Sequence, residues 1–255
     1  MDPDQYLQRL GYHGPREPTL ETLRALHVCH LHSVPFENLD VRSGRRIVLD
    51  EAAFFDKVVR RRRGGFCYEL NGLFAAMLRL LGFQVTNLSG RVSQDGNWPT
   101  NPEFDHLVLE VDLDGPWLVD VGFGDGFVEP IPLVPGLPVS AGQPFRLETH
   151  GGDWSLARGE PDGTWKVLYV FSRVPRRLEE FWERCLYHQT SPDSYFRQQL
   201  LCTLKTRTGR ETLSGERLIV TESGQRVERV LGSAEERERI LLERFGIPRG
   251  SLGAE

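Results

Sequence analysis

The chain contains the stretch Arg63-Gly64-Gly65-Phe66-Cys67-Tyr68-Glu69-Leu70-Asn71, which combines a tight turn with the start of a helix. Two adjacent glycines let a backbone turn sharply and approach another group closely. After them, apolar side chains recur at helical spacing and predict a helix from about Cys67 to Leu81, ended by Gly82. The buried side of this helix is expected to carry Leu70, Leu73, Phe74, Met77, Leu78 and Leu81. The sequence therefore places a cysteine in the first turn of a buried helix.

The position of Cys67 favours a reactive thiolate. Unpaired amide groups and the helix dipole at a helix start stabilise a negative charge, and the same amides could hold a developing oxyanion. Arginines at positions 60–63 add positive potential just upstream. A free cysteine is also among the residue types most often buried in a core. This stretch alone leaves both a nucleophile and an inert core residue open.

The rest of the chain divides into three parts with different patterns. Residues 1–82 are predicted to be helical, with Thr19 capping a helix that stops before Pro35 and Asp50 capping the next,. Strand-like runs separated by turn signals follow at residues 84–92, 104–111, 117–121, 145–149, 154–157 and 164–171,. Further on, residues 176–187, 191–201 and 233–245 favour helices, whereas residues 202–223 and 225–231 favour strands.

These patterns predict an α+β fold with three domains. The first is a helical bundle over residues 1–82 that carries the cysteine. The second is an antiparallel sheet or small barrel over residues 83–172, because its short runs are rich in valine and aromatic residues,. The third is an α/β lid over residues 173–255.

A predicted hairpin brings a histidine and an aspartate together. The runs at residues 104–111 and 117–121 flank an Asp-Gly turn signal,. A three-residue loop ending at a left-handed Gly115 would pair Asp112 with Pro116, so that His106 and Asp120 share one face as diagonal neighbours. A two-residue loop would put them on opposite faces. A Cys-His-Asp site of the papain or transglutaminase type therefore requires the odd-membered loop.

Asp120 is unusual because it interrupts the apolar run Leu118-Val119-Asp120-Val121. A carboxylate in such a strand is costly unless it is paired. The functional interpretation makes Cys67 the nucleophile, His106 the base and Asp120 the residue that orients the base. For His106 and Asp120 alone, a salt-bridged acid and a hydrogen-bonded core histidine stay open as the structural explanation.

Composition argues against several classes of partner. The formal net charge is −5 and 26% of residues are charged, so neither nucleic acid nor an anionic membrane is an expected partner,. No secretory leader or membrane span is expected, and the four cysteines lack the pattern of a disulfide framework, which predicts a cytoplasmic protein,. The histidine-rich residues 27–32 do not have zinc-ligand spacing, so no metal site is expected,.

At this point the chain resembles the arylamine N-acetyltransferase family. The resemblance lies in several segments spread in order over most of the chain: residues 32–40, 63–71, 106–109, 118–124, 191–196 and 209–213. It implies a ping-pong reaction in which acetyl-CoA acylates Cys67 and an arylamine, arylhydroxylamine or hydrazine then takes the acetyl group. It also implies His106 as the base and Asp120 as its orienting residue, with a helical first domain, an antiparallel β-barrel as the second domain and an α/β third domain.

The resemblance further suggests binding residues. Backbone amides at Gly124 and Gly126 are candidates to contact the CoA pyrophosphate, although a plain glycine turn explains them equally well and Asp125 is an awkward neighbour for a phosphate. Four positions match the family's arylamine pocket but are also ordinary core residues: Phe36, Val92, Phe123 and Phe196. An ion pair between Arg63 and Glu37 near the nucleophile is implied in the same way.

Three other functions compete with this prediction. An amide synthase of natural-product assembly would use the same three residues with a carrier-bound acyl chain. A thiol hydrolase or transglutaminase would share the site geometry, but the segment Pro35-Phe36-Glu37-Asn38-Leu39-Asp40 argues against it. A binding domain without catalysis is disfavoured because the cysteine, histidine and aspartate are all present.

Overall fold

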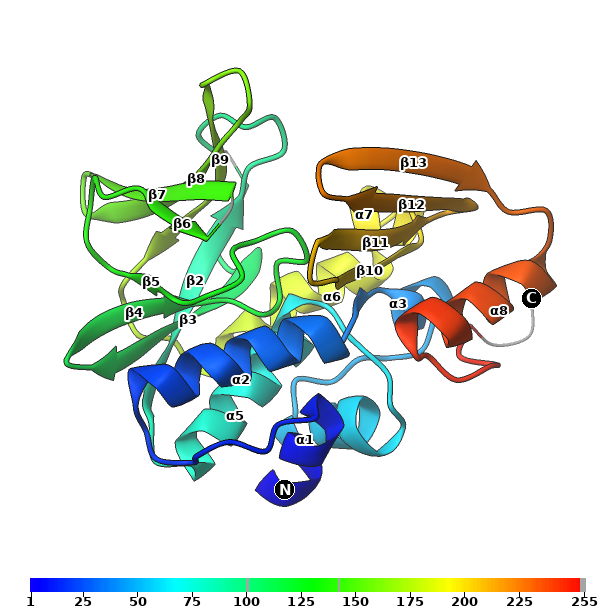
Figure 1. Ribbon diagram of the computed structural model, residues 1–255, viewed down its shortest axis with the longest axis horizontal. Helices are drawn as coiled ribbons and strands as arrows, with labels where there is room; N and C mark the ends of the chain where they lie inside the picture. Colours follow the sequence, from blue (N-terminus) through cyan, green and yellow to red (C-terminus); the bar gives the residue numbers. More distant parts are fainter. Residues whose placement is uncertain (100, 142, 253–255) are drawn as a thin grey trace.

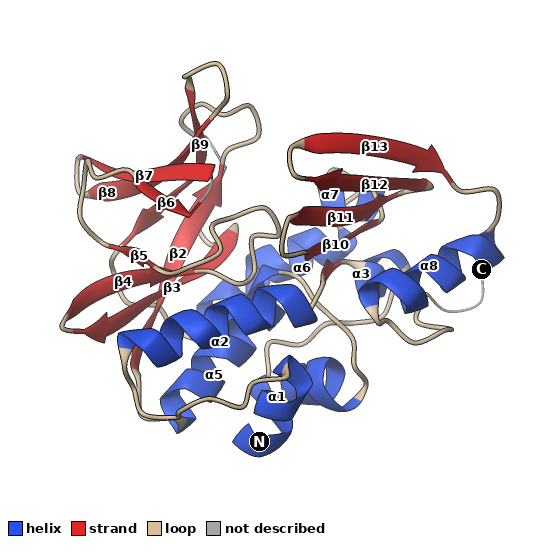
Figure 2. Cartoon of the chain, viewed as in Figure 1, coloured by secondary structure: helices blue, strands red, loops and turns tan. Residues whose placement is uncertain are grey.

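The computed structural model describes residues 1–99, 101–141 and 143–252, so residues 100, 142 and 253–255 of the predicted domains lie outside it. Helices lie along one side of the molecule, next to two separate β-sheets (Figure 1). The larger sheet comes from the middle of the chain, and the smaller one mainly from its last third (Figure 2). The predicted α+β class is confirmed.

The helices of the N-terminal region begin where the sequence predicts. Thr19 accepts a hydrogen bond from the backbone of Thr22 at 3.2 Å, and Asp50 accepts one from Ala53 at 2.8 Å, so both residues are N-caps,. The second of these helices continues as a π-helical segment, Asp56–Arg60. The α-helices of this region are α1 (Pro3–Leu10), α2 (Leu20–Ser33), α3 (Leu39–Arg42), α4 (Glu51–Phe55) and α5 (Cys67–Leu80).

Eight strands of the described chain form one antiparallel sheet that curls into a half-barrel. Their order across the sheet is β5 (Ile131–Pro132), β4 (Gly115–Val119), β3 (His106–Leu113), β2 (Gln84–Val92), β9 (Trp165–Ser172), β8 (Asp153–Gly159), β7 (Gln143–His150) and β6 (Val139–Ala141). On β3 and β4, Leu107, Leu109 and Val119 pack into the core shared with α5, whereas Val108 and Leu118 face the inside of the curl. Helix α5 therefore lies against the outer face of these strands.

The prediction of a barrel is only partly right. The edge strands β5 and β6 are short, and within the described strands they do not pair with each other. Ile131 and Pro132 of one edge and Val139 of the other line the same cavity. The sheet is therefore open on this side, and both of its edge strands border this cavity.

The β3–β4 hairpin has the predicted register. Asp112 pairs with Pro116 and Leu109 with Val119, and Gly115 has a φ of +116°. The strands extend further than predicted, so that Leu113 also pairs with Gly115. The loop is one residue rather than three, which is still odd, and the faces of the side chains are unchanged.

The smaller sheet combines one short strand from the N-terminal region with four strands from the last third of the chain. Its order is β1 (Phe36–Glu37), β10 (Leu201–Lys205), β11 (Gly209–Ser214), β12 (Arg217–Glu222) and β13 (Gln225–Val230), all antiparallel. Residues 202–223, which were predicted to favour strands, are thus divided among three strands. The last helix, α8 (Ala234–Phe245), is capped by Ser233 and ends at Gly246 as predicted.

The helix predicted over residues 191–201 is wrong for most of its length. Only α7 (Tyr195–Gln198) is helical there, after the 3-10 helix η2 (Leu178–Phe181) and α6 (Trp182–Thr190). The buried Asn38 side chain donates to the carbonyl groups of Phe196 and Gln199 and accepts from the backbone N–H of Leu201. These contacts satisfy the backbone groups that a longer helix would have used, so the chain can turn into β10.

Candidate active site

The two glycines before Cys67 pack directly against β1. A Cβ atom on Gly64 would lie 1.9 Å from the carbonyl oxygen of Pro35, which no side chain can tolerate. The carbonyl of Gly65 accepts a hydrogen bond from the backbone of Glu37 at 2.8 Å. Cys67 then begins α5 and is 4% exposed. The turn is fixed by close backbone contact, as the glycine pair indicated.

A buried cluster of charges lies beneath this turn, and we call it the ion network: Glu37, Asp40, Lys57, Arg63 and Glu69. Lys57 Nζ lies 2.8 Å from both Asp40 and Glu69, and Arg63 contacts Glu37 at 2.8 Å and Asp40 at 3.1 Å. Glu69 also accepts the backbone N–H of Phe66, the residue before Cys67. The ion pair of Arg63 with Glu37 is confirmed, and the remaining network went unpredicted.

The ion network contains more acids than bases, with three carboxylates against two cations. Burial raises the pKa of Glu69 to about 7, although Lys57 acts in the opposite direction,. Burial would lower the pKa of Lys57, but Glu37, Glu69 and Asp40 together raise it above its ordinary value. Lys57 is therefore a permanent cation that holds the first turn of α5 in place.

His106 and Asp120 form a buried pair on the inner face of the half-barrel. Nε2 of His106 lies 2.8 Å from Oδ2 of Asp120, and both residues are 2% exposed. Cys67 lines the same cavity as His106, and its side chain contributes to raising the pKa of that histidine. Because Asp120 takes Nε2, the nitrogen left to face the thiol is Nδ1. The structure thus brings together the three residues that the sequence analysis selected.

The charges in this site stabilise a protonated imidazole. Burial alone would lower the pKa of His106, but the Asp120 carboxylate and the Cys67 side chain outweigh it and raise this pKa to about 10,. Burial likewise opposes ionisation of Asp120, but His106, Asn71 and the backbone of Gly122 hold the pKa of the carboxyl below its ordinary value. The pair is therefore an imidazolium with a carboxylate at neutral pH.

Two further side chains hold Asp120 in position. Asn71, one turn along α5 from Cys67, donates to Oδ1 of Asp120 at 2.8 Å and accepts from the backbone of Val121 at 2.9 Å. Nε2 of His27 accepts from the backbone of Asp120 at 3.2 Å, and its Nδ1 contacts the carbonyl of Val128 at 2.7 Å. Burial lowers the pKa of His27 to about 4, so it is neutral and donates through Nδ1.

We expect His106 to make the stability of the fold depend on pH. Its pKa is about 10 in the folded protein and about 6.5 in an unfolded chain, so the stabilisation is complete below pH ~6.5 and is lost as the pH rises towards 10,. Urea denaturation from pH 6 to 10 should give a free energy of unfolding that falls more steeply in the wild type than in His106→Gln. Parallel curves for the two proteins would contradict this assignment.

A cavity of about 560 Å³ opens onto the His106 imidazole and the Cys67 thiol. Cys67 and His106 line it, and so do all four predicted pocket residues, Phe36, Val92, Phe123 and Phe196. Its other wall is polar and comes from α6 and from the residue before β3. The structure therefore brings the predicted pocket residues together at the reactive group, while their role in binding stays a prediction.

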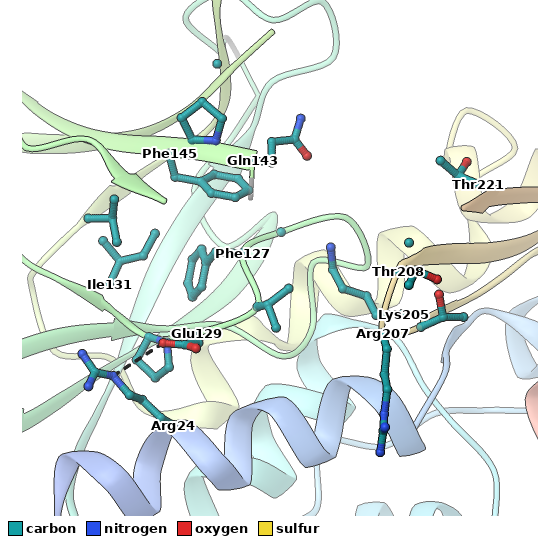
Figure 3. A pocket seen from close by; sticks show the side chains of 18 of the residues that line it. Arg24, Phe127, Glu129, Ile131, Gln143, Phe145, Lys205, Arg207, Thr208 and Thr221 are labelled. Carbon is teal, nitrogen blue, oxygen red and sulfur yellow. Dashed lines mark ion pairs between the residues drawn. The ribbon is translucent and has the colours of Figure 1, made fainter. Parts of the chain in front are cut away.

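A second cavity, of about 870 Å³, lies between the half-barrel and the β10–β11 turn (Figure 3). Apolar side chains of Phe127, Ile131 and Phe145 line one side of it, and Lys205 and Arg207 lie on the other (Figure 3). Gly126 lines this cavity, whereas Gly124 is not among the described residues that line either cavity. Gly124 instead has a φ of +82° and packs against Thr203 and Phe36.

Asp125, the awkward acid of this loop, is neutralised by its neighbours. It forms ion pairs with Arg158, at 2.7 Å, and with Arg210. Burial would raise the pKa of this carboxyl, but Arg210, Lys205 and Arg158 lower it below its ordinary value. Its charge is therefore compensated by the arginines and does not dominate the loop.

No group of three potential metal ligands occurs among residues 1–99, 101–141 and 143–252. In the same described part of the chain, no helix combines the length and the apolar character that crossing a membrane requires.

Comparison with known proteins gives the class of this chain. A family model described as N-acetyltransferase matches residues 19–250. The chain is 40% identical to an arylamine N-acetyltransferase of Mycolicibacterium smegmatis, over 99% of this chain and 94% of that protein, and 35% identical to one of Escherichia coli, over 96% and 88%. Its fold matches the Mycobacterium marinum arylamine N-acetyltransferase solved in complex with CoA, with a TM-score of 0.90, 35% identity, and coverage of 98% and 97%.

The fold and the matched family model define an acyltransferase. Within that class, the chain belongs to the arylamine N-acetyltransferase family.

Proposed function

We propose that this enzyme transfers an acetyl group from acetyl-CoA to aromatic amines, hydroxylamines or hydrazines through a thioester on Cys67. The observation that carries the proposal is the buried His106–Asp120 pair, with His106 and Cys67 both lining one aromatic cavity. This resembles the papain and transglutaminase type, with the thiol at a helix start, the base on a strand and the acid directly after the next strand,.

In the first half-reaction, the Cys67 thiolate attacks the carbonyl carbon of acetyl-CoA. A carbon–sulfur bond to Cys67 forms, the carbon–sulfur bond to CoA breaks, and the departing thiolate takes a proton from the His106 imidazolium. Asp120 stabilises that imidazolium and fixes the orientation of its ring. The backbone amides at the start of α5 can stabilise the negative oxygen of the tetrahedral intermediate.

In the second half-reaction, the acceptor nitrogen attacks the acetyl thioester. A carbon–nitrogen bond forms and the bond to Cys67 breaks, which regenerates the thiolate. His106, now neutral, takes the proton from the nitrogen and becomes imidazolium again. The enzyme thus returns to its starting state without any other base.

The two cavities suggest separate places for the two substrates. The larger one offers Lys205 and Arg207 for the phosphates of CoA and an apolar side for its pantetheine arm,. The loop that separates the cavities contributes Phe123 to the smaller one and Gly126 to the larger. We assign the smaller cavity, with its aromatic lining, to the acceptor. Only Gly126 of the two predicted glycines is well placed for CoA.

We also propose that the enzyme acts in the cytoplasm. Its four cysteines all lie in the described residues and are free, and the proposed nucleophile is one of them. A reducing compartment keeps such a thiol available for catalysis.

Mass spectrometry of the intact protein after mixing with acetyl-CoA tests the proposed function. We expect one acetyl adduct that an aromatic amine discharges, that is absent in Cys67→Ala, and that persists in the control Cys29→Ala. Cys29 is suitable as the control because it is partly exposed and distant in sequence from the site. A folded protein that forms no adduct would contradict acetyl-CoA as the donor and favour a carrier-bound acyl chain.

A further inference from the structure

The His27 side chain of α2 spans the two ends of one loop. This loop begins at Asp120, directly after β4, and reaches Val128 shortly before β5. His27 accepts the backbone N–H of Asp120 at 3.2 Å with Nε2, and it donates to the carbonyl group of Val128 at 2.7 Å with Nδ1. These two hydrogen bonds close residues 120–128 into one unit, which we call the inter-cavity loop.

The inter-cavity loop forms part of both cavities. Phe123 lines the smaller one, whereas Gly126, Phe127 and Val128 line the larger. The Phe127 ring, seen at the wall of the larger cavity in Figure 3, stacks on the His27 imidazole. The ring centroids lie 5.5 Å apart and the ring planes differ by 8°. One buried side chain therefore contacts the loop at its start, at its end and on the ring beside the larger cavity.

The start of the loop also rests on the helix that carries Cys67. A Cβ atom on Gly122 would lie 2.8 Å from the Cα atom of Cys67 and 2.8 Å from the side-chain nitrogen of Asn71. The backbone of the loop is thus in close contact with α5. Movement away from α5 would strain the 2.8 Å contact of Asp120 with His106 and the hydrogen bond from Asn71. The position of the loop start therefore sets the position of the Asp120 carboxylate.

The imidazole of His27 matches the two backbone groups that it bridges. It is 0% exposed, and Phe74 of α5 packs edge-on against it at 6.1 Å. Burial lowers the pKa of His27 to about 4, so it is neutral at physiological pH and offers one donor and one acceptor,. A side chain without these groups would leave the N–H of Asp120 and the carbonyl group of Val128 without this partner, and the loop would have to rearrange.

We propose that His27 is a positioning residue that holds the Asp120 carboxylate and the Phe127 wall of the larger cavity in one arrangement. His27 is not among the described residues that line either cavity, so it acts through these neighbours. Its acceptor nitrogen fixes the backbone of the residue that orients His106. Its donor nitrogen and its ring fix the wall beside the site assigned to CoA. This inference rests on the proposed function, because it concerns the proposed catalytic pair and that assignment.

The test compares His27→Met with His27→Gln, two side chains of similar length and shape that differ in their hydrogen-bonding groups. The amide of glutamine keeps one donor and one acceptor, whereas methionine has no donor and only a weak acceptor. Two properties are measured. The first is the pH dependence of iodoacetamide alkylation at Cys67, followed by mass spectrometry of the peptide that contains it. The second is the affinity for CoA, measured by calorimetry. Neither property requires acetyl transfer.

We expect His27→Met to raise the pH midpoint of Cys67 alkylation by roughly 0.7 unit, the effect of one hydrogen bond. The reason is that a displaced Asp120 stabilises the His106 imidazolium, and hence the thiolate, less well. We also expect CoA to bind about fivefold more weakly, again the effect of one hydrogen bond. His27→Gln should recover most of both changes. A residue needed only for stability would move neither property in the folded protein.

His30→Met is the matched control. His30 is as buried as His27, lies three residues further along α2 and also packs against Phe74, but its Nδ1 bonds to the hydroxyl group of Tyr6. This variant should unfold more easily and leave both properties unchanged. His27→Phe, which has neither a donor nor an acceptor, replaces His27→Met if the latter does not fold.

Wild-type values of both properties in folded His27→Met would overturn the proposal. So would a change in only one of them, because His27 is proposed to fix both places together, and so would equal changes in His30→Met. If CoA does not bind to the wild type, the proposed donor fails and alkylation alone decides. If Cys67 of the wild type alkylates like an ordinary thiol, the proposed nucleophile fails and the affinity for CoA alone decides.

Discussion

Exchanging Asp120 for asparagine is expected to lower kcat for acetyl transfer by roughly 10⁴-fold, the size seen when the aspartate of a comparable triad is made neutral. Asparagine has the same shape, so the contacts with Asn71 and Gly122 can largely persist. What is lost is the charge that raises the pKa of His106 to about 10. The imidazole should then be neutral at pH 7 and unable to protonate the departing thiolate.

The measurement is the rate of Cys67 acetylation in a single turnover, followed over a range of pH. Asp112→Asn is the matched control, because Asp112 lies on the same hairpin but is exposed. Circular dichroism should show both variants folded, since a neutral His106 leaves no unpaired charge. A loss of less than tenfold in Asp120→Asn would mean that this carboxylate is a structural acid and not the residue that orients the base.

Replacing Lys57 with methionine is expected to lower the free energy of unfolding by about 3–5 kcal/mol, the usual effect of breaking a buried ion pair. Lys57 contacts Asp40 and Glu69 at 2.8 Å and Glu37 at 3.9 Å. Without it, Arg63 would remain, together with the exposed Arg45, which lies 3.6 Å from Asp40. Methionine preserves the apolar stem of the side chain. The change therefore removes the charge with little loss of packing.

Urea denaturation measures this effect, and Arg60→Met is its control because Arg60 is an exposed cation three residues away. The double variant Lys57→Met/Glu69→Gln should recover much of the lost stability, since it also removes one of the stranded acids. Equal stability of Lys57→Met and the wild type would show that the network is not held together by its charges.

Much of the site could be predicted because its signals are local. The glycine pair, the helical spacing after Cys67 and the Asp-Gly turn each depend on a few neighbouring residues,. Asp120 was informative for another reason: a charge in an apolar strand needs a partner, and the hairpin register offered His106. The predicted three-residue loop and the observed one-residue loop are both centred on Asp114. They therefore give the same strand register, with Asp112 paired to Pro116.

The remaining features depend on contacts between segments distant in sequence. The contacts of Asp105 with Arg184 and His188 form only because α6 docks beside Asp105, and nothing near Arg184 or His188 indicates that partner. Asn38 shortens the predicted helix over residues 191–201 from more than a hundred residues away. The open half-barrel was missed because β5 and β6 are too short for alternation to show. Such effects cannot be read from a pattern within one segment.

The pairing of β1 with β10 has a consequence for how the enzyme matures on the ribosome. The turn before Cys67 rests on β1, whose sheet partner is made only when residues 201–205 have been synthesised. A nascent chain therefore carries its nucleophile long before the surroundings of that nucleophile are complete. Nascent chains that end before β10 should not react selectively at Cys67. Labelling of ribosome-stalled chains of different lengths with a thiol reagent can check this. Acyl-transfer competence would then arise late in synthesis, and prematurely terminated chains would lack it.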